Sequence, residues 1–190
     1  GEVITATVDK ATDKVVILNL GMNTQSFMPV EEALMGETYV PGKQIKVTVT
    51  KVEETTKSPK VFVSRSNKEI IKRLFELYIP EIAQGVIEVI GIVREPGNRS
   101  KIGIKSNNIN VDAKGACVGV GGARIKQINQ ALNGERIDIF EWNDNPILLI
   151  AEALTPAKVI SVLIDEETHK SIVIVPDDQL SLAIGKAGQN

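Results

Sequence analysis

The sequence predicts a multi-domain α+β protein, in which a strand-rich segment is followed by two copies of a mixed α/β unit. Three observations support this prediction. Ile45, Val47 and Val49 alternate with polar residues, which is typical of a half-buried strand. Beyond residue 67 the apolar spacing changes to that of helices. A Gly-x-x-Gly tetrapeptide then occurs twice in the same local context, which indicates an internal repeat.

Residues 1–66 contain short runs of β-branched and apolar residues that are separated by polar turns. Strands are expected at residues 2–8, 14–20, 25–30, 45–50 and 61–64. Five short strands in about 65 residues favour a small closed barrel of the OB type.

Residues 67–84 are predicted to connect this barrel to the first α/β unit. Asn67 is a candidate N-cap for a helix that runs to about Ile79, and Pro80 follows it. The first unit, residues 85–145, has the order strand, strand, helix, glycine turn, helix and strand. These elements are expected at residues 86–93, 101–105, 113–118, 123–132 and 137–141.

The second unit, residues 146–190, repeats this order. After the apolar residues 148–153, a helix is expected to start at 156–161. Strands at 159–164 and 171–175 and a short helix at 177–184 follow. The copy then stops at its glycine turn, without the helix and strand that come next in the first copy. We therefore expect it to be truncated, and the natural protein to continue past Asn190.

The composition excludes several classes of protein. The hydrophobic share of 43% and the charged share of 24% are ordinary for a globular chain. No apolar run approaches the ~20 residues that span a bilayer, so no membrane partner is expected. The single cysteine fits a reducing compartment, which predicts a cytoplasmic protein.

The net charge of −2 does not by itself indicate a nucleic-acid partner, but the charges are unevenly distributed. Between residues 94 and 126 the acidic residues are only Glu95 and Asp112. The basic residues of that segment are Arg94, Arg99, Lys101, Lys105, Lys114, Arg124 and Lys126. From residue 143 onward acidic residues dominate. This pattern fits either two solvated faces or a positive binding surface beside a negative segment.

The two glycine turns are the strongest functional signal. They are Gly119-Val120-Gly121-Gly122 and Gly185-Lys186-Ala187-Gly188, each after a short amphipathic helix. Glycines allow close backbone approach and positive φ, and the helix after the turn presents free N–H groups. A sugar-phosphate backbone suits such a site, with bases lying in an adjoining apolar groove. One copy alone would more often be a tight turn between helices. Neither copy has the spacing of a nucleotide phosphate loop.

The residues that could perform catalysis lack suitable partners. His169 is the only histidine and lies in an acidic turn, so it is expected to be exposed. Cys117 lies on a short apolar helix and is expected to be buried. Asp177 and Asp178 precede an apolar helix and are interpreted as N-cap and first-turn acids. We therefore expect no catalytic residue, metal site or cofactor, and no enzyme activity.

Three aromatic residues could contact bases. Trp142 ends an alternating strand, where a place in the core or at its rim is favoured over base stacking. Phe27 and Phe62 lie on barrel strands. Each would contribute ~1–3 kcal/mol to base stacking if exposed, although burial in so small a barrel is equally compatible with the pattern.

Several segments resemble the bacterial transcription elongation factor NusA family. Residues 115–125 (Gly-Ala-Cys-Val-Gly-Val-Gly-Gly-Ala-Arg-Ile), 133–139 and 141–142 are similar to the family's first KH domain. Residues 94–102 and 110–112 are similar to the segments that precede it. Residues 182–190 (Leu-Ala-Ile-Gly-Lys-Ala-Gly-Gln-Asn) are similar to the glycine turn of the second KH domain. The family's barrel end and connector helix are similar to residues 36–42, 63–65 and 72–77 of this sequence.

The resemblance implies two type II KH domains, the second one incomplete, behind the barrel. It implies a monomeric factor that binds single-stranded RNA, the nascent transcript, and modulates pausing, termination and antitermination. RNA polymerase would be contacted mainly by an N-terminal domain that is missing here. The alternatives left open are an exosome-cap-like RNA-binding subunit and a protein–protein scaffold.

The expected RNA-binding residues include both glycine turns. The family commonly has a basic residue between the glycines of the first turn, where this sequence has Val120 and Gly121. The positive field beside that turn is therefore expected from Arg124, Lys126, Arg99 and Lys101. Lys186 supplies the base in the second turn. The complete set is Gly119, Val120, Gly121, Gly122, Arg124, Lys126, Arg99, Lys101, Gly185, Lys186, Ala187, Gly188, Gln189, Asn190 and Phe27.

Overall fold

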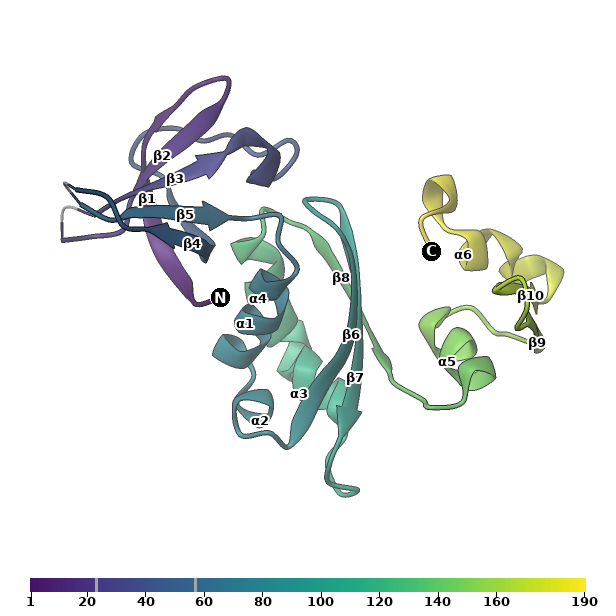
Figure 1. The fold of residues 1–190 in the computed structure, drawn as a ribbon. Coiled ribbons are helices and arrows are strands. Elements are labelled where there is room, and N and C mark those ends of the chain that lie inside the picture. The colour runs from purple at the N-terminus through teal and green to yellow at the C-terminus, as the bar shows by residue number, and fades with distance from the viewer. Residues whose placement is uncertain (23, 57) are drawn as a thin grey trace.

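The structure is a computed structural model that describes residues 1–190 except residues 23 and 57. It consists of a β-barrel, a three-stranded sheet covered by helices, and a smaller C-terminal unit (Figure 1). Among the described residues, no helix has the length and apolar character needed to cross a membrane.

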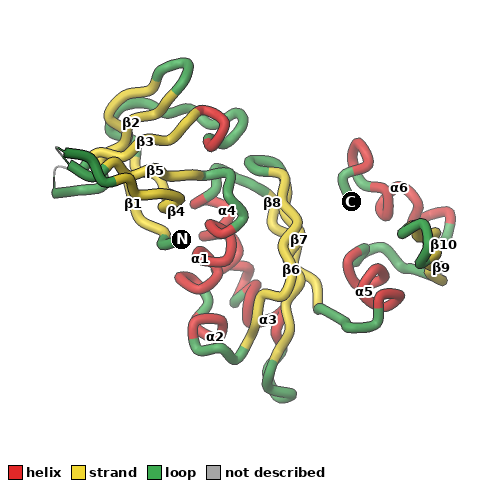
Figure 2. Tube along the Cα trace, in the orientation of Figure 1, coloured by secondary structure: helices red, strands yellow, loops and turns green. Residues whose placement is uncertain are grey.

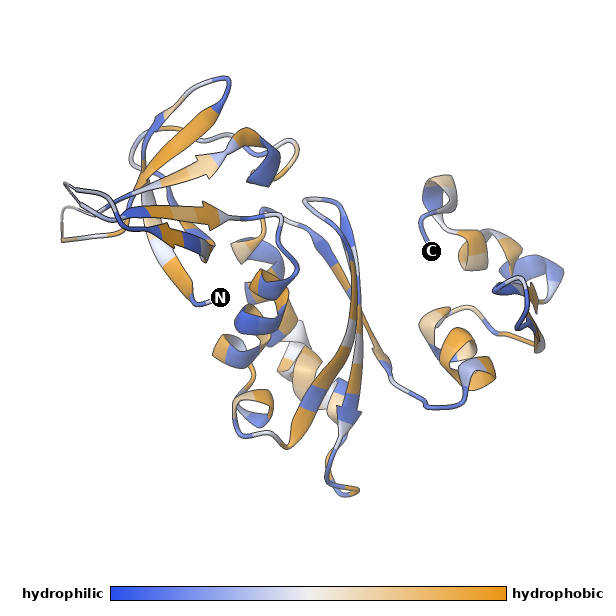
Figure 3. Ribbon diagram, in the orientation of Figure 1, coloured by the Kyte–Doolittle hydropathy of each residue, from blue (hydrophilic) through white to orange (hydrophobic). Residues whose placement is uncertain are grey.

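The barrel is closed and has five strands, as predicted. In space the order is β1-β2-β3-β5-β4, and β3 and β5 pair in parallel. The strands are β1 (Val3–Ala11), β2 (Val15–Asn19), β3 (Gln25–Pro29), β4 (Gln44–Glu53) and β5 (Lys60–Ser64). Apolar residues alternate with hydrophilic ones along them (Figure 3), so that one face of each strand fills the interior. Leu18, Met28, Val47 and Val63 are fully buried there.

The first α/β unit is a three-stranded sheet in the order β6-β7-β8, with β8 parallel to β7. The strands are β6 (Ile87–Glu95), β7 (Arg99–Ser106) and β8 (Arg136–Glu141). The helices α3 (Ala113–Val118) and α4 (Ala123–Ala131) lie on one face of the sheet (Figure 2). This arrangement agrees with the predicted KH domain.

The connector is formed by α1 (Glu69–Tyr78) and α2 (Pro80–Ala83). Asn67 lies before α1, and its Oδ1 accepts a hydrogen bond from the Glu69 N–H at 2.9 Å. The apolar face of α1 belongs to the same buried cluster as the sheet and α4. Phe75, Ile102 and Ile128 are fully buried in this cluster. The connector is therefore also part of the core of the first unit.

The second unit contains α5 (Pro146–Ala153), the strand pair β9 (Ser161–Asp165) and β10 (Lys170–Ile174), and α6 (Leu180–Ile184). Short 3-10 turns occur at Val30–Glu32, Val120–Gly122, Asp177–Gln179 and Lys186–Gly188.

Two local predictions for the second unit were wrong. No helix starts at 156–161, because the helix lies earlier, where Asn145 caps α5 by accepting a hydrogen bond from the Ile147 N–H at 3.0 Å. Pro146 fits the first position of that helix because it has no N–H to leave unpaired. The N-cap before residues 177–179 is Pro176, so Asp177 and Asp178 are first-turn acids only.

Buried polar contacts join the barrel to the first unit. Arg65 is 1% exposed, and its guanidinium donates to both carboxylate oxygens of Glu37, at 2.8 and 2.9 Å. Its Nη1 also donates to the backbone oxygens of Lys46 on β4 and Ala131 at the end of α4. One side chain thus holds the barrel against α4.

A second buried pair lies at the β6–β7 turn. Arg94 donates through Nε and Nη2 to the carboxylate of Glu135, and Ser100 and the Gly97 N–H donate to the same carboxylate. Arg94 also reaches the Asn67 backbone oxygen at 2.9 Å. Burial raises the pKa of Glu135, but the hydrogen bonds from Arg94 and Ser100 outweigh it and hold the pKa below its ordinary value.

Candidate nucleic-acid interface

The first glycine turn is an open backbone bend between α3 and α4. Gly119 ends α3 with φ 75° and ψ 171°, and Gly121 and Gly122 both have positive φ. A Cβ added at Gly121 would meet no atom within 4 Å, and Val120 is 96% exposed. A polymer can therefore approach this backbone closely, as predicted for a glycine turn that binds a sugar-phosphate strand.

The second glycine turn follows α6 and has the same backbone path. Gly185 has φ 72° and ψ 174°, Ala187 has φ 54° and ψ 28°, and Gly188 has φ 72°. Lys186, Ala187 and Gly188 are exposed. The repeat predicted from the sequence is thus present in the structure as one backbone shape that occurs twice.

An apolar groove lies beside the first turn. It has a volume of about 300 Å³ and is lined by residues of α3, α4 and β8, including Val118, Ile125, Ile137 and Ile139. Lys114 stands at the same groove. The segment that follows α5 also contributes to the lining, through Thr155 and Pro156. The site thus combines an open backbone, an apolar groove and a nearby cation. Such a site can bind a sugar-phosphate strand whose bases are splayed out.

Arg124 lies under the first turn and is paired. Its Nη1 donates to the Ala116 backbone oxygen and to Glu81, both at 2.7 Å. A Cβ on Gly119 would come within 2.8 Å of Arg124 Cγ, so the glycine makes room for this side chain. Lys126, two residues further along α4, is exposed. Of these two predicted cations, Lys126 is the more accessible to a ligand.

Arg99 and Lys101 join the first unit to the second. Arg99 forms an ion pair with Asp138 through Nε, and its Nη2 donates to Asn190 Oδ1 at 3.0 Å. Lys101 donates to the Ala153 backbone oxygen. Burial, with the nearby Arg99 guanidinium, lowers the pKa of Lys101. Both cations therefore lie between the two units.

Gln189 and Asn190 complete this contact. Gln189 Nε2 donates to Glu95 Oε2 at 3.4 Å, and the Asn190 amide donates to the backbone oxygens of Leu182 and Ala183. The end of the second turn is thus tied back to α6 and across to the β6–β7 turn. The structure brings together the predicted residues Arg99, Gly185, Gln189 and Asn190 at one junction.

Phe27 lies apart from both turns, on β3 of the barrel. It is half-buried, its ring centroid is 6.2 Å from that of Phe62, and it lines a hollow of about 500 Å³. Gln25 and Lys60 line the same hollow. Part of the Phe27 ring is therefore available for stacking.

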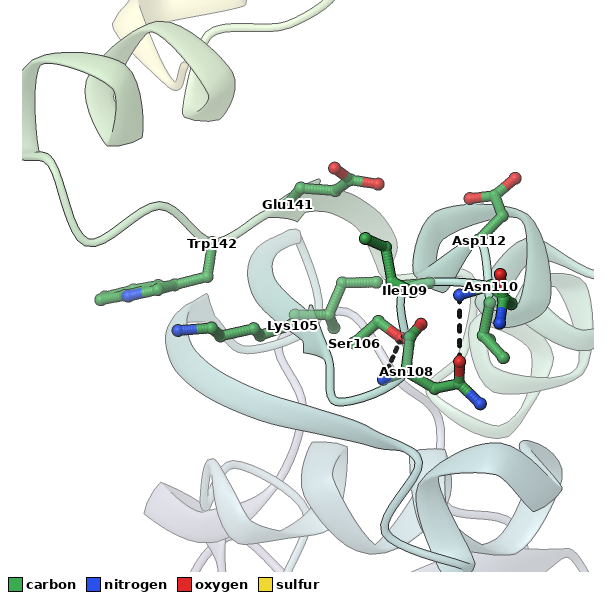
Figure 4. Close-up of a pocket in the computed structure, with 11 residues that line it drawn as sticks. Lys105, Ser106, Asn108, Ile109, Asn110, Asp112, Glu141 and Trp142 are labelled. Atoms are coloured by element: carbon green, nitrogen blue, oxygen red, sulfur yellow. Dashed lines mark hydrogen bonds between the residues drawn. The ribbon is translucent and has the colours of Figure 1, made fainter.

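Trp142 is half-buried against the sheet of the first unit, which agrees with the place in the core or at its rim that the sequence favours. Its indole lies on the paired glycines Gly91 and Gly103, where an added Cβ would come within 2.8 and 2.7 Å of the ring. It borders a hollow of about 620 Å³ beside the loop of residues 106–112 (Figure 4). Ile109, which is fully exposed, lines the same hollow. The sequence signal for this packing is the pair of glycines on adjacent strands, because two glycines opposite each other leave room for one large side chain.

Cys117 and His169 lie as expected. Cys117 is buried, and burial, with the carboxylate of Glu81, raises the pKa of its thiol to about 12. His169 is exposed in the turn between β9 and β10. Within the described part of the chain, no group of three or more His, Cys, Asp or Glu residues is placed to hold a metal ion.

A closed barrel followed by a β-β-α-turn-α-β unit with an open glycine turn defines a protein of the barrel-plus-KH class. Residues 65–142 match NusA-like first KH domains, and residues 146–190 match NusA-like second KH domains. Because these matches together cover more than half of the chain, the protein belongs to the NusA-like family.

Relatives over the full chain agree with this assignment. The transcription termination/antitermination protein NusA of Bacillus subtilis (strain 168) is 44% identical over 189 residues, which are 100% of this chain and 51% of that protein. The protein of the same name from Thermus thermophilus is 41% identical over 191 residues, 100% of this chain and 49% of that protein. The chain spans about half the length of the curated relatives it matches.

Proposed function

We propose that this chain binds single-stranded RNA through its two glycine turns and the groove between α3, α4 and β8. The observation that carries the proposal is the pair of turns, which share one backbone path and are both open to solvent. Phosphates would lie against the exposed turn backbones, near Lys126 and Lys186. Bases would lie in the apolar groove, and a base could stack on Phe27.

The biological role that follows is a proposal at the level of the whole protein. Relatives at 44% and 41% identity are termination/antitermination proteins, which supports a part in modulating pausing, termination and antitermination by RNA polymerase. The RNA would then be the nascent transcript, and the protein would act as a monomer in the cytoplasm without catalysing a reaction. We also propose that the chain divides into a barrel at residues 1–66, a connector at 67–84, a first KH domain at 85–145 and an incomplete second KH domain at 146–190.

The family assignment favours this function over an exosome-cap-like subunit. A scaffold whose glycine turns only pack helices is also less favoured, because a Cβ at Gly121 or Gly188 would meet nothing within 4 Å. Turns that served packing alone would be covered by a neighbouring element.

The test is the salt dependence of binding to a single-stranded RNA of about 16 nucleotides, the upper site size of one OB fold. If phosphates are contacted, log K falls with log salt by about 0.7 for each phosphate. Duplex RNA of the same sequence serves as the matched ligand control and is expected to bind more weakly. A flat salt response, or equal binding of duplex and single strand, contradicts the proposal.

A further inference from the structure

The hollow of about 620 Å³ beside Trp142, called the Trp142 hollow below, is not used by the function proposed above. It is lined by the loop of residues 106–112, by Glu141, which ends β8, and by Trp142, which follows it. Asp112 belongs to this lining and precedes α3, whereas the first glycine turn begins at the other end of that helix. The six residues of α3 separate the two places by about 9 Å at ~1.5 Å per residue. A ligand in the hollow therefore does not occupy the turn.

The aromatic wall of the hollow is fixed in position. The indole of Trp142 lies on the paired glycines Gly91 and Gly103. Its Nε1 donates to Asp144 Oδ1 at 3.2 Å, and Lys105 Nζ donates to the other oxygen of the same carboxylate at 2.9 Å. A ligand thus meets a ring that is already oriented, so that little conformational entropy is lost on binding.

The facing loop presents a large apolar side chain to solvent. Ile109 is 100% exposed. The loop around it is tied by local hydrogen bonds, from Ser106 Oγ to the Asn108 backbone oxygen at 2.7 Å and from the Asn110 N–H to Asn108 Oδ1 at 3.0 Å (Figure 4). A single exposed apolar residue is common on protein surfaces. An exposed isoleucine beside an oriented tryptophan is instead typical of the apolar centre of a protein-binding site.

The rim of the hollow is negatively charged. Its ionisable lining residues are Lys105, Asp112 and Glu141. Lys105 is already paired with Asp144, which lies outside the lining. Glu141 is exposed, and its carboxylate forms no ion pair or hydrogen bond with any residue that the structure describes. A cationic side chain is therefore favoured at this rim, and the phosphates of a nucleic acid are repelled from it.

We propose that the Trp142 hollow is a docking site for a segment of a partner protein that carries an aliphatic side chain beside an arginine or lysine. The aliphatic side chain packs between Ile109 and the indole. The cation pairs with Glu141 and can lie against the indole face, where its charge is attracted to the ring. This inference goes beyond RNA binding and does not depend on it. The chain can hold this partner while the first glycine turn holds an RNA strand.

The test selects peptides from a phage-displayed library of random sequences on the full chain of 190 residues. The library is first depleted on the variant Ile109→Asp, which removes peptides that bind any other surface. The peptides that remain are expected to carry a basic residue next to an aliphatic one. Trp142 is the only tryptophan of the chain, so tryptophan-free copies of these peptides should change its fluorescence on binding.

Two variants measure the two parts of the contact, and both positions are exposed. Ile109→Ser should weaken the selected peptides by at least about tenfold, the lower end of what burial of an aliphatic side chain contributes. Glu141→Gln should weaken them about two- to fivefold and reduce the salt dependence of binding, because the ion pair is exposed. The matched controls are Ile160→Ser and Glu166→Gln, at exposed positions of the second unit, and they should leave the peptide affinity unchanged.

Several outcomes would overturn the inference. These are the absence of any peptide after depletion, a predominance of acidic peptides, and an unchanged Trp142 fluorescence. Equal losses in Ile109→Ser and Ile160→Ser would also overturn it, because binding would then follow general surface hydrophobicity. Single-stranded RNA should bind Ile109→Ser as tightly as the unaltered chain, and a loss there would assign the hollow to the RNA site instead. If the unaltered chain bound no RNA, the proposed function would fail and the docking site would stand.

Discussion

The most direct perturbation of the proposed interface is a negative charge at Gly121. This residue has φ +60° and open space around its Cβ position, so Asp and Asn fit there equally. Both carry the left-handed backbone cost of ~1–2 kcal/mol, which therefore cancels between them. Only the charge differs between the two variants.

The electrostatic cost follows from a phosphate held against the turn. Two like charges at about 4 Å repel by about 1 kcal/mol in water and by about 4 kcal/mol at the effective dielectric of a protein surface. Gly121 is exposed, which puts the expected value nearer the lower figure. At ~1.4 kcal/mol for each factor of ten, Gly121→Asp should bind RNA from roughly fivefold to several hundredfold more weakly than Gly121→Asn.

Fluorescence anisotropy with a labelled single-stranded RNA measures this difference directly. The gap between Asp and Asn should narrow as salt is added, because exposed charges are screened. Thermal unfolding of both variants checks that the fold is retained equally. Equal RNA affinities for two folded variants would show that no phosphate lies near this turn, and the reasoning would be wrong.

Four further predictions concern the framework of the site. Glu135→Gln leaves the Arg94 guanidinium buried without its counter-charge and should lower the free energy of unfolding by about 3–5 kcal/mol, as measured in urea. The pKa of Glu135 is depressed in the folded state, so the stabilisation by its carboxylate is present above the unfolded pKa and is lost as the pH falls through the folded pKa. Thermal melts of the unaltered protein and of Glu135→Gln across a pH series measure this loss of stability. Parallel stability curves for the two proteins would contradict the prediction. The Cys117 thiol, with its pKa raised to about 12, should react with a thiol reagent near neutral pH only after denaturant is added. Arg99→Gln removes the donor to Asn190 and should speed amide hydrogen exchange at residues 185–190, whereas unchanged exchange would mean that this contact does not hold the second turn.

Local patterns were sufficient to predict most of the fold. Residues 113–118 were predicted as a helix and form α3 with those bounds, since the helix is amphipathic and ends at a glycine with positive φ. The barrel strands follow the period-two alternation. The prediction of a helix start at 156–161 is wrong because Asn145 and Pro146 carry a stronger start signal than Pro156.

The electrostatics of the candidate site could not be predicted in the same way. Arg124 was expected to contribute a free positive charge, yet its partner Glu81 is 43 residues away in sequence. Arg99 is paired with Asp138, which lies opposite Lys101 on the adjacent strand. Ion pairs of this kind depend on which elements pack together, and a count of charges along the chain contains no such information.

The two glycine turns have the same backbone conformation at their third position, although the residue there differs. At the third position of each turn the first copy has Gly121, with φ 60° and ψ 20°, and the second has Ala187, with φ 54° and ψ 28°. An alanine in the left-handed region costs ~1–2 kcal/mol relative to its normal conformation. The second copy therefore keeps the shape at an energetic cost, although glycine would have avoided it. Such strain persists where the surrounding structure enforces it and is concentrated at functional sites. Because Ala187 is exposed, packing of its own side chain does not account for the conformation. The shape of the turn itself is what the two copies share, which is expected if that backbone is the surface that meets the RNA strand.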